Sequence, residues 1–359
     1  MGVWQVYGGR GFTALGDLVP HKHTVLTVSS GDKEFFLRDD DVIFPGLADF
    51  HVHLRGNQNT LGVPPAVLTS SGVFLVADAG THGWMHWAPP PTSDPIPFRK
   101  YWVALLPHGL DSYPVSPKFC GLTGTEDVQL RDLFHSNPQI MGLKIRLGQH
   151  DAGEDRALLR EGIKQARANQ VGLMIHLTGT YLSWQEILEP LIAGDVLTHV
   201  FHGRRGSLLK DPHAASLLGK AQDRGVILDV GHGANHFAWE AFGRALAEGI
   251  APTTISTDLT QHTWQQPPVY DLPFVCSKLL AAGLNWRAVY QGVVLNPTRH
   301  LRTRLPDRSI VVMRFVASPT AFEDAQGVIL QGEGLWQPVM VVAAGHPVTD
   351  RLTPEPKAR

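Results

Sequence analysis

Cysteines, long apolar runs and an excess of basic residues are all missing or scarce in this 359-residue sequence. The two cysteines, Cys120 and Cys276, are too few for a disulfide framework or a four-thiolate zinc site, and we expect both to be buried apolar side chains. No run approaches the roughly 20 apolar residues that cross a bilayer, and the first residues show no basic region followed by an apolar run. We therefore expect a cytoplasmic protein with no membrane partner.

The near balance of charge argues against a polyanionic partner. Lys and Arg total 31 against 33 for Asp and Glu, which gives a formal net charge of -2. Proteins that bind a phosphate backbone need a cationic surface, so we do not expect a nucleic acid as partner. What the sequence does have is 18 histidines and a hydrophobic content of 43%, which is enough for a large core.

Short apolar runs alternate with helical patterns through the middle of the chain. The runs are 47–53, 73–79, 101–107, 140–147, 171–178, 195–201, 225–231 and 253–259. They are apolar on both faces, as parallel strands buried between two layers must be. Helical patterns lie between them at 125–135, 153–169, 238–249 and 273–283. Eight strands alternating with helices predict an α/β fold, a (β/α)₈ TIM-like barrel.

The predicted barrel covers residues 46–307, so both ends of the chain lie outside it. Residues 1–45 and 308–359 contain further strand-like runs, at 24–28, 34–37, 309–316, 328–331 and 335–344. Chain ends commonly lie close together at a domain surface. We therefore predict a small β domain built from both ends of the chain.

Residues that can ligate a metal fall at the C-terminal ends of the predicted strands, where barrel enzymes carry their chemistry. These residues are His51, His53, Lys144, His176, His199 and Asp258. His51 and His53 are two residues apart on one strand, so their imidazoles point to the same side and can reach one metal ion.

Each of these patterns has an ordinary explanation when taken alone. A His-X-His pair is often incidental. A strand lysine can extend to solvent from the end of a barrel, and an aspartate after a strand often caps a helix. The convergence of six such residues on one barrel mouth nevertheless favours a metal site.

Lys144 fits such a site only if it is chemically altered, because a protonated ammonium cannot ligate a cation. Burial lowers the pKa of a lysine, and the neutral amine can add carbon dioxide to form a carbamate. A carbamate has two oxygens and a negative charge, which suits it to bridging two divalent ions.

Six segments carry a family resemblance. They are 45–55 (PGLADFHVHLR), 77–81 (ADAGT), 142–146 (GLKIR), 198–203 (THVFHG), 229–233 (DVGHG) and 255–259 (ISTDL). Together they resemble the amidohydrolase superfamily, and within it the amidohydrolase/deacetylase branch of dihydroorotase-like metallohydrolases. The resemblance covers residues 45–300.

The resemblance implies a hydrolase with two divalent metal ions, expected to be zinc, bridged by N6-carboxylated Lys144. The implied ligands are His51, His53 and Asp258 for the first ion, and His176 and His199 for the second. A metal-bridging hydroxide is the implied nucleophile, and Asp258 is the implied general base and acid.

The implied substrate is a small molecule with an amide or ester bond, and we expect deacylation of an N-acyl amino acid or an acyl-hydroxy acid. Hydrolysis of a cyclic amide, as by a dihydroorotase, hydantoinase or lactonase, is the alternative. The loop 80–84 lacks the asparagine of dihydroorotases, which disfavours dihydroorotate itself. A bridging lysine argues against a deaminase, and the complete ligand set argues against a non-catalytic binding protein.

Four further residues are candidates for substrate binding: Arg55, His202, Arg204 and His232. Arg55 is suited to pairing with a substrate carboxylate through two hydrogen bonds. The other three are equally suited to orienting the metal ligands. The sequence leaves the oligomeric state open, a homo-oligomer included.

Overall fold

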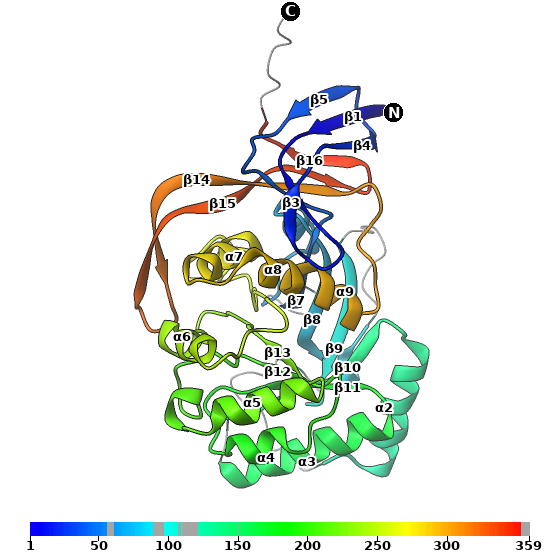
Figure 1. The fold of residues 1–359 in the computed structure, drawn as a ribbon. Helices are drawn as coiled ribbons and strands as arrows, with labels where there is room; N and C mark the ends of the chain where they lie inside the picture. Colours follow the sequence, from blue (N-terminus) through cyan, green and yellow to red (C-terminus); the bar gives the residue numbers. More distant parts are fainter. Residues whose placement is uncertain (56–60, 89–96, 107–108, 110–120, 150, 353–359) are drawn as a thin grey trace, which may run out of the picture.

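A parallel sheet forms the centre of the computed structural model, which describes all residues except 56–60, 89–96, 107–108, 110–120, 150 and 353–359 (Figure 1). The sheet has seven strands in the order β13-β12-β11-β10-β9-β8-β7. Their bounds are β7 (Leu47–Val52), β8 (Val73–Gly83), β9 (Phe98–Ala104), β10 (Ile140–Arg146), β11 (Gly172–His176), β12 (Val196–Thr198) and β13 (Ile227–Asp229). Each strand overlaps one of the first seven predicted runs.

The segment predicted as the eighth strand, 253–259, lies between the two edge strands without forming a regular strand. We call it the closing segment. Isolated parallel bridges join Thr254 to Asp229 on β13 and Leu259 to Val52 on β7. Asp258 has a φ of 51°, in the left-handed region that an extended strand does not contain. The predicted barrel is therefore confirmed, with the correction that an irregular segment fills its eighth position.

Buried apolar side chains fill the barrel beneath the strand ends. Met174 lies two residues before His176, and Val196 two residues before Thr198, so each points to the same side of the sheet as the polar residue that follows it. Both belong to one buried cluster with Phe50. The barrel interior is thus packed below and polar at its C-terminal end.

Helices cover the outside of the sheet (Figure 1). They are α1 (Pro65–Ser70), η1 (Trp84–His86), α2 (Gly124–Ser136), α3 (Ala152–Ala168), α4 (Trp184–Leu188), η3 (Leu208–Lys210), α5 (Ala214–Asp223), α6 (Trp239–Ala247), α7 (Leu272–Ala281), α8 (Trp286–Tyr290), the π-helical η4 (Gln291–Leu295) and α9 (Asn296–His300). The four predicted helices correspond to α2, α3, α6 and α7. A capping box of Thr123 and Glu126 begins α2, since each side chain accepts a hydrogen bond from the backbone N–H of the other residue.

The chain ends form two further sheets. One has the order β4-β1-β5, from β1 (Gly2–Tyr7), β4 (His23–Val28) and β5 (Lys33–Phe36). The other has the order β16-β15-β14-β6-β2-β3, from β2 (Arg10–Phe12), β3 (Leu18–Pro20), β6 (Val42–Phe44), β14 (Ile310–Glu323), β15 (Ile329–Ala343) and β16 (His346–Asp350). Antiparallel pairing of β6 with β14 joins the two ends of the chain in one sheet. The division into domains at residues 46 and 307 stays a prediction.

Strands β14 and β15 form a long hairpin that extends from this sheet to α6 (Figure 1). Trp239 at the start of α6 donates its indole N–H to the carbonyl of Phe322, 3.0 Å away. Ala325 in the hairpin turn donates its backbone N–H to the carbonyl of Phe237. The turn of the hairpin is thereby fixed to the loop that follows β13.

The structure tests two predictions made from features that the sequence lacks, one about the cysteines and one about membrane-spanning segments. Cys276 is buried on α7, as predicted, and Cys120 lies outside the described residues. None of the helices in the described part of the chain combines the length and apolar character needed to cross a bilayer.

A buried ion pair between the chain ends gives the first prediction. The Arg314 guanidinium on β14 donates to both oxygens of the buried Asp41 carboxylate, at 2.8 and 2.7 Å. Asp41→Ala leaves a cation without its partner, so we expect the free energy of unfolding to fall by about 3 kcal/mol, measured by urea denaturation. Asp40 is exposed, and Asp40→Ala should change the value by less than about 0.5 kcal/mol. Equal effects of the two substitutions would contradict the account.

Candidate metal centre

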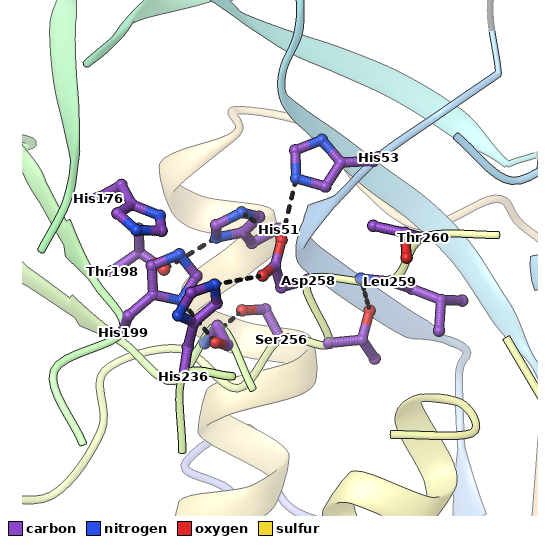
Figure 2. A network of polar contacts seen from close by, with 12 residues as sticks. His51, His53, His176, Thr198, His199, His236, Ser256, Asp258, Leu259 and Thr260 are labelled. Atoms are coloured by element: carbon purple, nitrogen blue, oxygen red, sulfur yellow. Dashed lines mark hydrogen bonds and ion pairs between the residues drawn. The ribbon is translucent and has the colours of Figure 1, made fainter. Parts of the chain in front are cut away.

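The structure brings the six predicted ligand residues together at the C-terminal end of the barrel, and Figure 2 shows all of them except Lys144. They come from different elements: His51 and His53 from the end of β7, Lys144 from β10, His176 from the end of β11, His199 from just after β12, and Asp258 from the closing segment. His199 has a φ of 65°, and its left-handed backbone ends β12 one residue earlier.

The Asp258 carboxylate lies between the imidazoles. Its Oδ1 is 3.2 Å from Nε2 of His51 and 2.9 Å from Nε2 of His53. Its Oδ2 is 3.9 Å from Nε2 of His236 (Figure 2). One carboxylate therefore faces three rings within a buried space.

Two overlapping groups could each hold a cation. His51, His199 and Asp258 offer ligand atoms that all lie within 4.8 Å of one another, and the same holds for His176, His199 and His236. The ring centroids of His199 are 4.4 Å from those of His176 and 4.3 Å from those of His236. The site thus has donors for more than one ion.

Hydrogen bonds to the protein orient the rings of His51 and His53. Nδ1 of His51 is 2.8 Å from the hydroxyl of Thr198, whose own proton goes to Asp229. Nδ1 of His53 is likewise 2.8 Å from the hydroxyl of Thr81, whose proton goes to the carboxylate of Asp78. Because each hydroxyl already donates elsewhere, we assign the ring proton to Nδ1 in both histidines.

His199 is held in the same way, since its Nδ1 lies 2.6 Å from the carbonyl of Gly231 and can only donate to it. In all three rings, Nε2 therefore presents a lone pair to the site. Burial and Lys144 lower the pKa of His51, but Asp258 and Asp229 outweigh them and raise it. When both rings are neutral, the lone pairs of His51 and His53 repel the Asp258 carboxylate. A divalent cation removes this repulsion, so the donor set fits a metal.

Charge states at neutral pH suit the same role. Burial, together with neighbouring positive groups, holds the pKa of His176 and His199 well below the usual histidine value. Burial opposes ionisation of Asp258, but the positive charge of protonated His51 and hydrogen bonds from His51 and His53 outweigh it and keep the pKa of this carboxyl well below its usual range. Neutral imidazoles and a charged carboxylate are the ligand forms that metals bind.

Lys144 is buried, and its Nζ has no hydrogen-bond partner among the described residues. Burial lowers the pKa of this amine to about 7. Gly80, at a φ of +83°, makes room for the side chain, because a Cβ there would come within 2.9 Å of Lys144. A buried amine that is partly neutral near pH 7 is competent to form a carbamate.

A cavity of about 550 Å³ opens over this centre. His51, His53, Lys144, His176 and Asp258 line it. Apolar side chains such as Leu61, Leu106 and Leu158 form much of the remaining wall. Two further lining residues, His236 and Arg146, are missing from the residues predicted as a site.

The sequence carries a signal for each of these two residues. His236 lies in the loop that follows β13, a few residues beyond His232, which the sequence analysis selects instead. Arg146 ends the GLKIR motif and lies two residues beyond Lys144, hence on the same face of β10.

The four predicted substrate contacts do not line the cavity among the described residues. Arg55 is exposed and donates to the side-chain oxygen of Gln261. His202 is buried, with Nδ1 accepting from the backbone N–H of the exposed Arg204 at 3.1 Å. Their roles in substrate binding stay predictions.

His232 is buried and both of its ring nitrogens are engaged by the protein. Nζ of Lys278 donates to Nε2 at 2.8 Å, and Nδ1 donates to the carbonyl of Gly233 at 3.0 Å. Lys278 also donates to the carbonyls of Pro268 and Glu323, the second of which ends β14. This lysine therefore fixes the hairpin and the loop after β13 to one another, and His232 is placed to orient that loop.

Comparison with known proteins supports this fold. No family model matches the chain. It is 28% identical to a curated deacetylase of Agrobacterium fabrum over 325 residues, which cover 85% of this chain and 78% of that protein. It is 27% identical to a curated deacetylase of Brucella anthropi over 326 residues, or 86% of this chain and 80% of the relative.

Among solved structures, the chain resembles a dihydroorotase with a TM-score of 0.81 and 24% identity, covering 96% of this chain and 98% of that one. It resembles an adenine deaminase with a TM-score of 0.76 and 21% identity over the same shares of the two chains. These comparisons confirm the predicted resemblance to the amidohydrolase superfamily and the TIM-type barrel. The donor set described above fits a divalent metal centre.

The lowered pKa of Lys278, about 7 because of its burial, predicts a pH dependence of stability. Between this value and the ordinary lysine pKa the unfolded chain binds more protons than the folded one, so folding is favoured increasingly as pH rises. Relative to Lys278→Met, the wild type should gain up to about 1.4 kcal/mol of unfolding free energy per pH unit from about pH 7 to pH 9.

Urea denaturation at several pH values measures this difference. Lys220 is exposed on α5, and Lys220→Met should follow the wild-type curve. Curves for the wild type and Lys278→Met that stay parallel across the range would contradict the lowered pKa.

Proposed function

We propose that this protein is a metal-dependent hydrolase of amide or ester bonds whose binuclear centre removes the acyl group from an N-acyl amino acid or an acyl-hydroxy acid. The observation that carries the proposal is a set of buried imidazoles, one buried carboxylate, and one buried amine with no hydrogen-bond partner among the described residues, gathered at a single cavity. The deacetylase names of the two curated relatives support the acyl-transfer chemistry.

In this proposal His51, His53 and Asp258 would hold one ion, His176 and His199 would hold the other, and Lys144 as its carbamate would be shared between them. Zinc is the metal that best suits imidazole and carboxylate donors in a hydrolytic site. When bound there, two such ions would supply a hydroxide nucleophile near neutral pH and would polarise the acyl carbonyl. His236 adds a third imidazole beside the second group.

Asp258 moves the proton. Its carboxylate lines the cavity and is charged at neutral pH, so it can accept the proton of the attacking water. The same carboxyl then delivers this proton to the leaving amine nitrogen or alkoxide oxygen. The left-handed backbone of the closing segment directs the carboxylate toward the imidazoles from the edge of the barrel.

Hydrolysis of a cyclic amide is the second candidate, because dihydroorotase and D-hydantoinase structures share this fold, the latter with a TM-score of 0.60 and 12% identity. Both candidates use the same centre and differ in the substrate that the cavity admits. A cytoplasmic location and a homo-oligomeric state remain part of the proposal.

Replacing Lys144 tests the binuclear centre. Lys144→Ala removes the bridging group, so we expect purified protein to lose bound metal and kcat/KM to fall roughly a thousandfold or more. Metal analysis and turnover of an N-acetyl amino acid measure the two effects. Lys164→Ala, which alters an exposed lysine on α3, should change neither. Full activity in Lys144→Ala would exclude the proposed role.

A substrate screen combined with metal analysis separates the candidate reactions. We expect two metal ions per wild-type chain and turnover of N-acetyl amino acids or acetyl-hydroxy acids, with little turnover of hydantoins, lactones or aminated rings. The leaving amine or alcohol and the released acid are quantified by chromatography. One metal ion per chain together with release of ammonia would instead identify a deaminase.

A further inference from the structure

His236 is the histidine of this centre whose ring makes no hydrogen bond to the described residues. The other rings each have one: His51 with Thr198, His53 with Thr81, His176 with Thr178, and His199 with Gly231. Nδ1 of His236 is buried without a partner among the described residues, and Nε2 is 3.9 Å from Oδ2 of Asp258, too far for a hydrogen bond. Buried polar atoms are rarely left unpaired, so this nitrogen is suited to a ligand from outside the protein.

The protein fixes the backbone that carries His236. The next residue, Phe237, is buried and accepts at its carbonyl the hydrogen bond from Ala325 in the hairpin turn. Gly233 leaves space beside the His236 ring, because a Cβ there would lie 2.7 Å from its Cδ2. The ring itself lines the cavity. The loop is therefore anchored on either side of a side chain whose ring nitrogens the described residues do not hold.

The charge of Asp258 decides which nitrogen of His236 carries the proton. Burial lowers the pKa of His236 to about 3, so at pH 7 the ring is neutral and has one N–H and one lone pair. A carboxylate attracts an N–H and repels a lone pair, so we assign the proton to Nε2, which faces Asp258 (Figure 2). The lone pair is then on Nδ1, the buried nitrogen without a partner.

Two further imidazoles lie beside the His236 ring. The centroid of His176 is 4.8 Å from that of His236, and the centroid of His199 is 4.3 Å from it. The three rings offer ligand atoms that all lie within 4.8 Å of one another. His199 donates its ring proton to Gly231 and so has none for His236. Three neighbouring imidazoles that do not donate to one another are a donor set that zinc binds.

We infer that His236 is a protein ligand of the second metal ion, which it binds through Nδ1 together with His176 and His199. This inference rests on the metal centre of the proposed function, and it adds a ligand that is not among the six predicted residues. The first ion would have a carboxylate of its own in Asp258, whereas the second would have three neutral imidazoles. Such a set favours zinc over manganese.

Stepwise titration of the metal-free protein with Zn²⁺, followed by calorimetry, measures the affinity of each ion. His236→Leu removes the ligand nitrogen and keeps an apolar side chain in the wall. We expect one binding step to weaken about a hundredfold and the other by less than about threefold. His236→Glu, which offers a carboxylate oxygen at similar reach, should recover most of the lost affinity.

His262→Leu is the matched control. His262 lines the same cavity, is exposed, and belongs to neither of the two candidate metal groups. Both binding steps of this variant should equal those of the wild type.

Cobalt reports the ligand itself. In the Co²⁺-loaded wild type, each bound imidazole that keeps an N–H gives a hyperfine-shifted proton resonance that disappears in heavy water. His236→Leu should remove one of these resonances, and His262→Leu should remove none.

Two unchanged binding steps in His236→Leu, or an unchanged set of shifted resonances, would overturn the inference and leave the proposed metal centre standing. Equal weakening of both steps, or no recovery in His236→Glu, would assign His236 a structural role instead. If the wild type binds no divalent ion, the metal centre fails, and this ligand fails with it. These measurements do not depend on turnover, so failure of the proposed deacylase reaction alone would not alter them.

Discussion

The whole site depends on two buried carboxylates that hold an irregular segment in the gap of the barrel. Asp229 on β13 accepts hydrogen bonds from the hydroxyls of Thr254 and Ser256, each at 2.7 Å. Asp49 on β7 accepts from the backbone N–H and the hydroxyl of Thr257, at 3.1 and 2.6 Å. Hydrogen bonds to the two edge strands thus hold the closing segment from both sides. Without these hydrogen bonds Asp258 could not be held in a left-handed conformation with its carboxylate against the imidazoles.

Two buried carboxylates, Asp229 again and Asp78, also reach the metal ligands, each through one threonine hydroxyl. Asp229 also accepts from Thr198, and the Thr198 hydroxyl accepts from Nδ1 of His51. Asp78 does the same for His53 through Thr81. Barrel closure and the orientation of His51 therefore share the carboxylate of Asp229. Buried polar networks are stabilising when every member is satisfied and costly when one is removed, so the architecture of the barrel and the chemistry of the site are not independent.

Much of the fold could be predicted from the sequence because buried parallel strands leave continuous apolar runs such as 73–79 and 140–147. Helices of ten or more residues, such as α3, are also long enough for the helical spacing of their apolar residues to be visible in the sequence. Five-residue helices such as α4 are too short to show one. The runs 328–331 and 335–344 belong to one strand, β15, because Gly332 and Gly334 interrupt the apolar pattern without ending the pairing.

The site was predictable as far as strand ends locate side chains. His51, His53, Lys144 and His176 follow from their places on strands, and Asp258 from its motif. His236 did not follow, because it lies in a loop whose path is set by contacts with the distant hairpin, including the bond from Ala325 to Phe237. His232 is the converse case: its sequence position indicates the mouth, but a buried lysine from α7 occupies its ring nitrogen. Sequence periodicity carries no information about such long-range contacts.

The most direct test of the account is the location of bound metal in crystals of the protein grown with zinc. The account predicts two anomalous-scattering peaks, one within the group His51, His53 and Asp258 and one within the group His176 and His199. Continuous electron density should extend from Nζ of Lys144 to both peaks. A single peak, or peaks away from these residues, would contradict the binuclear centre.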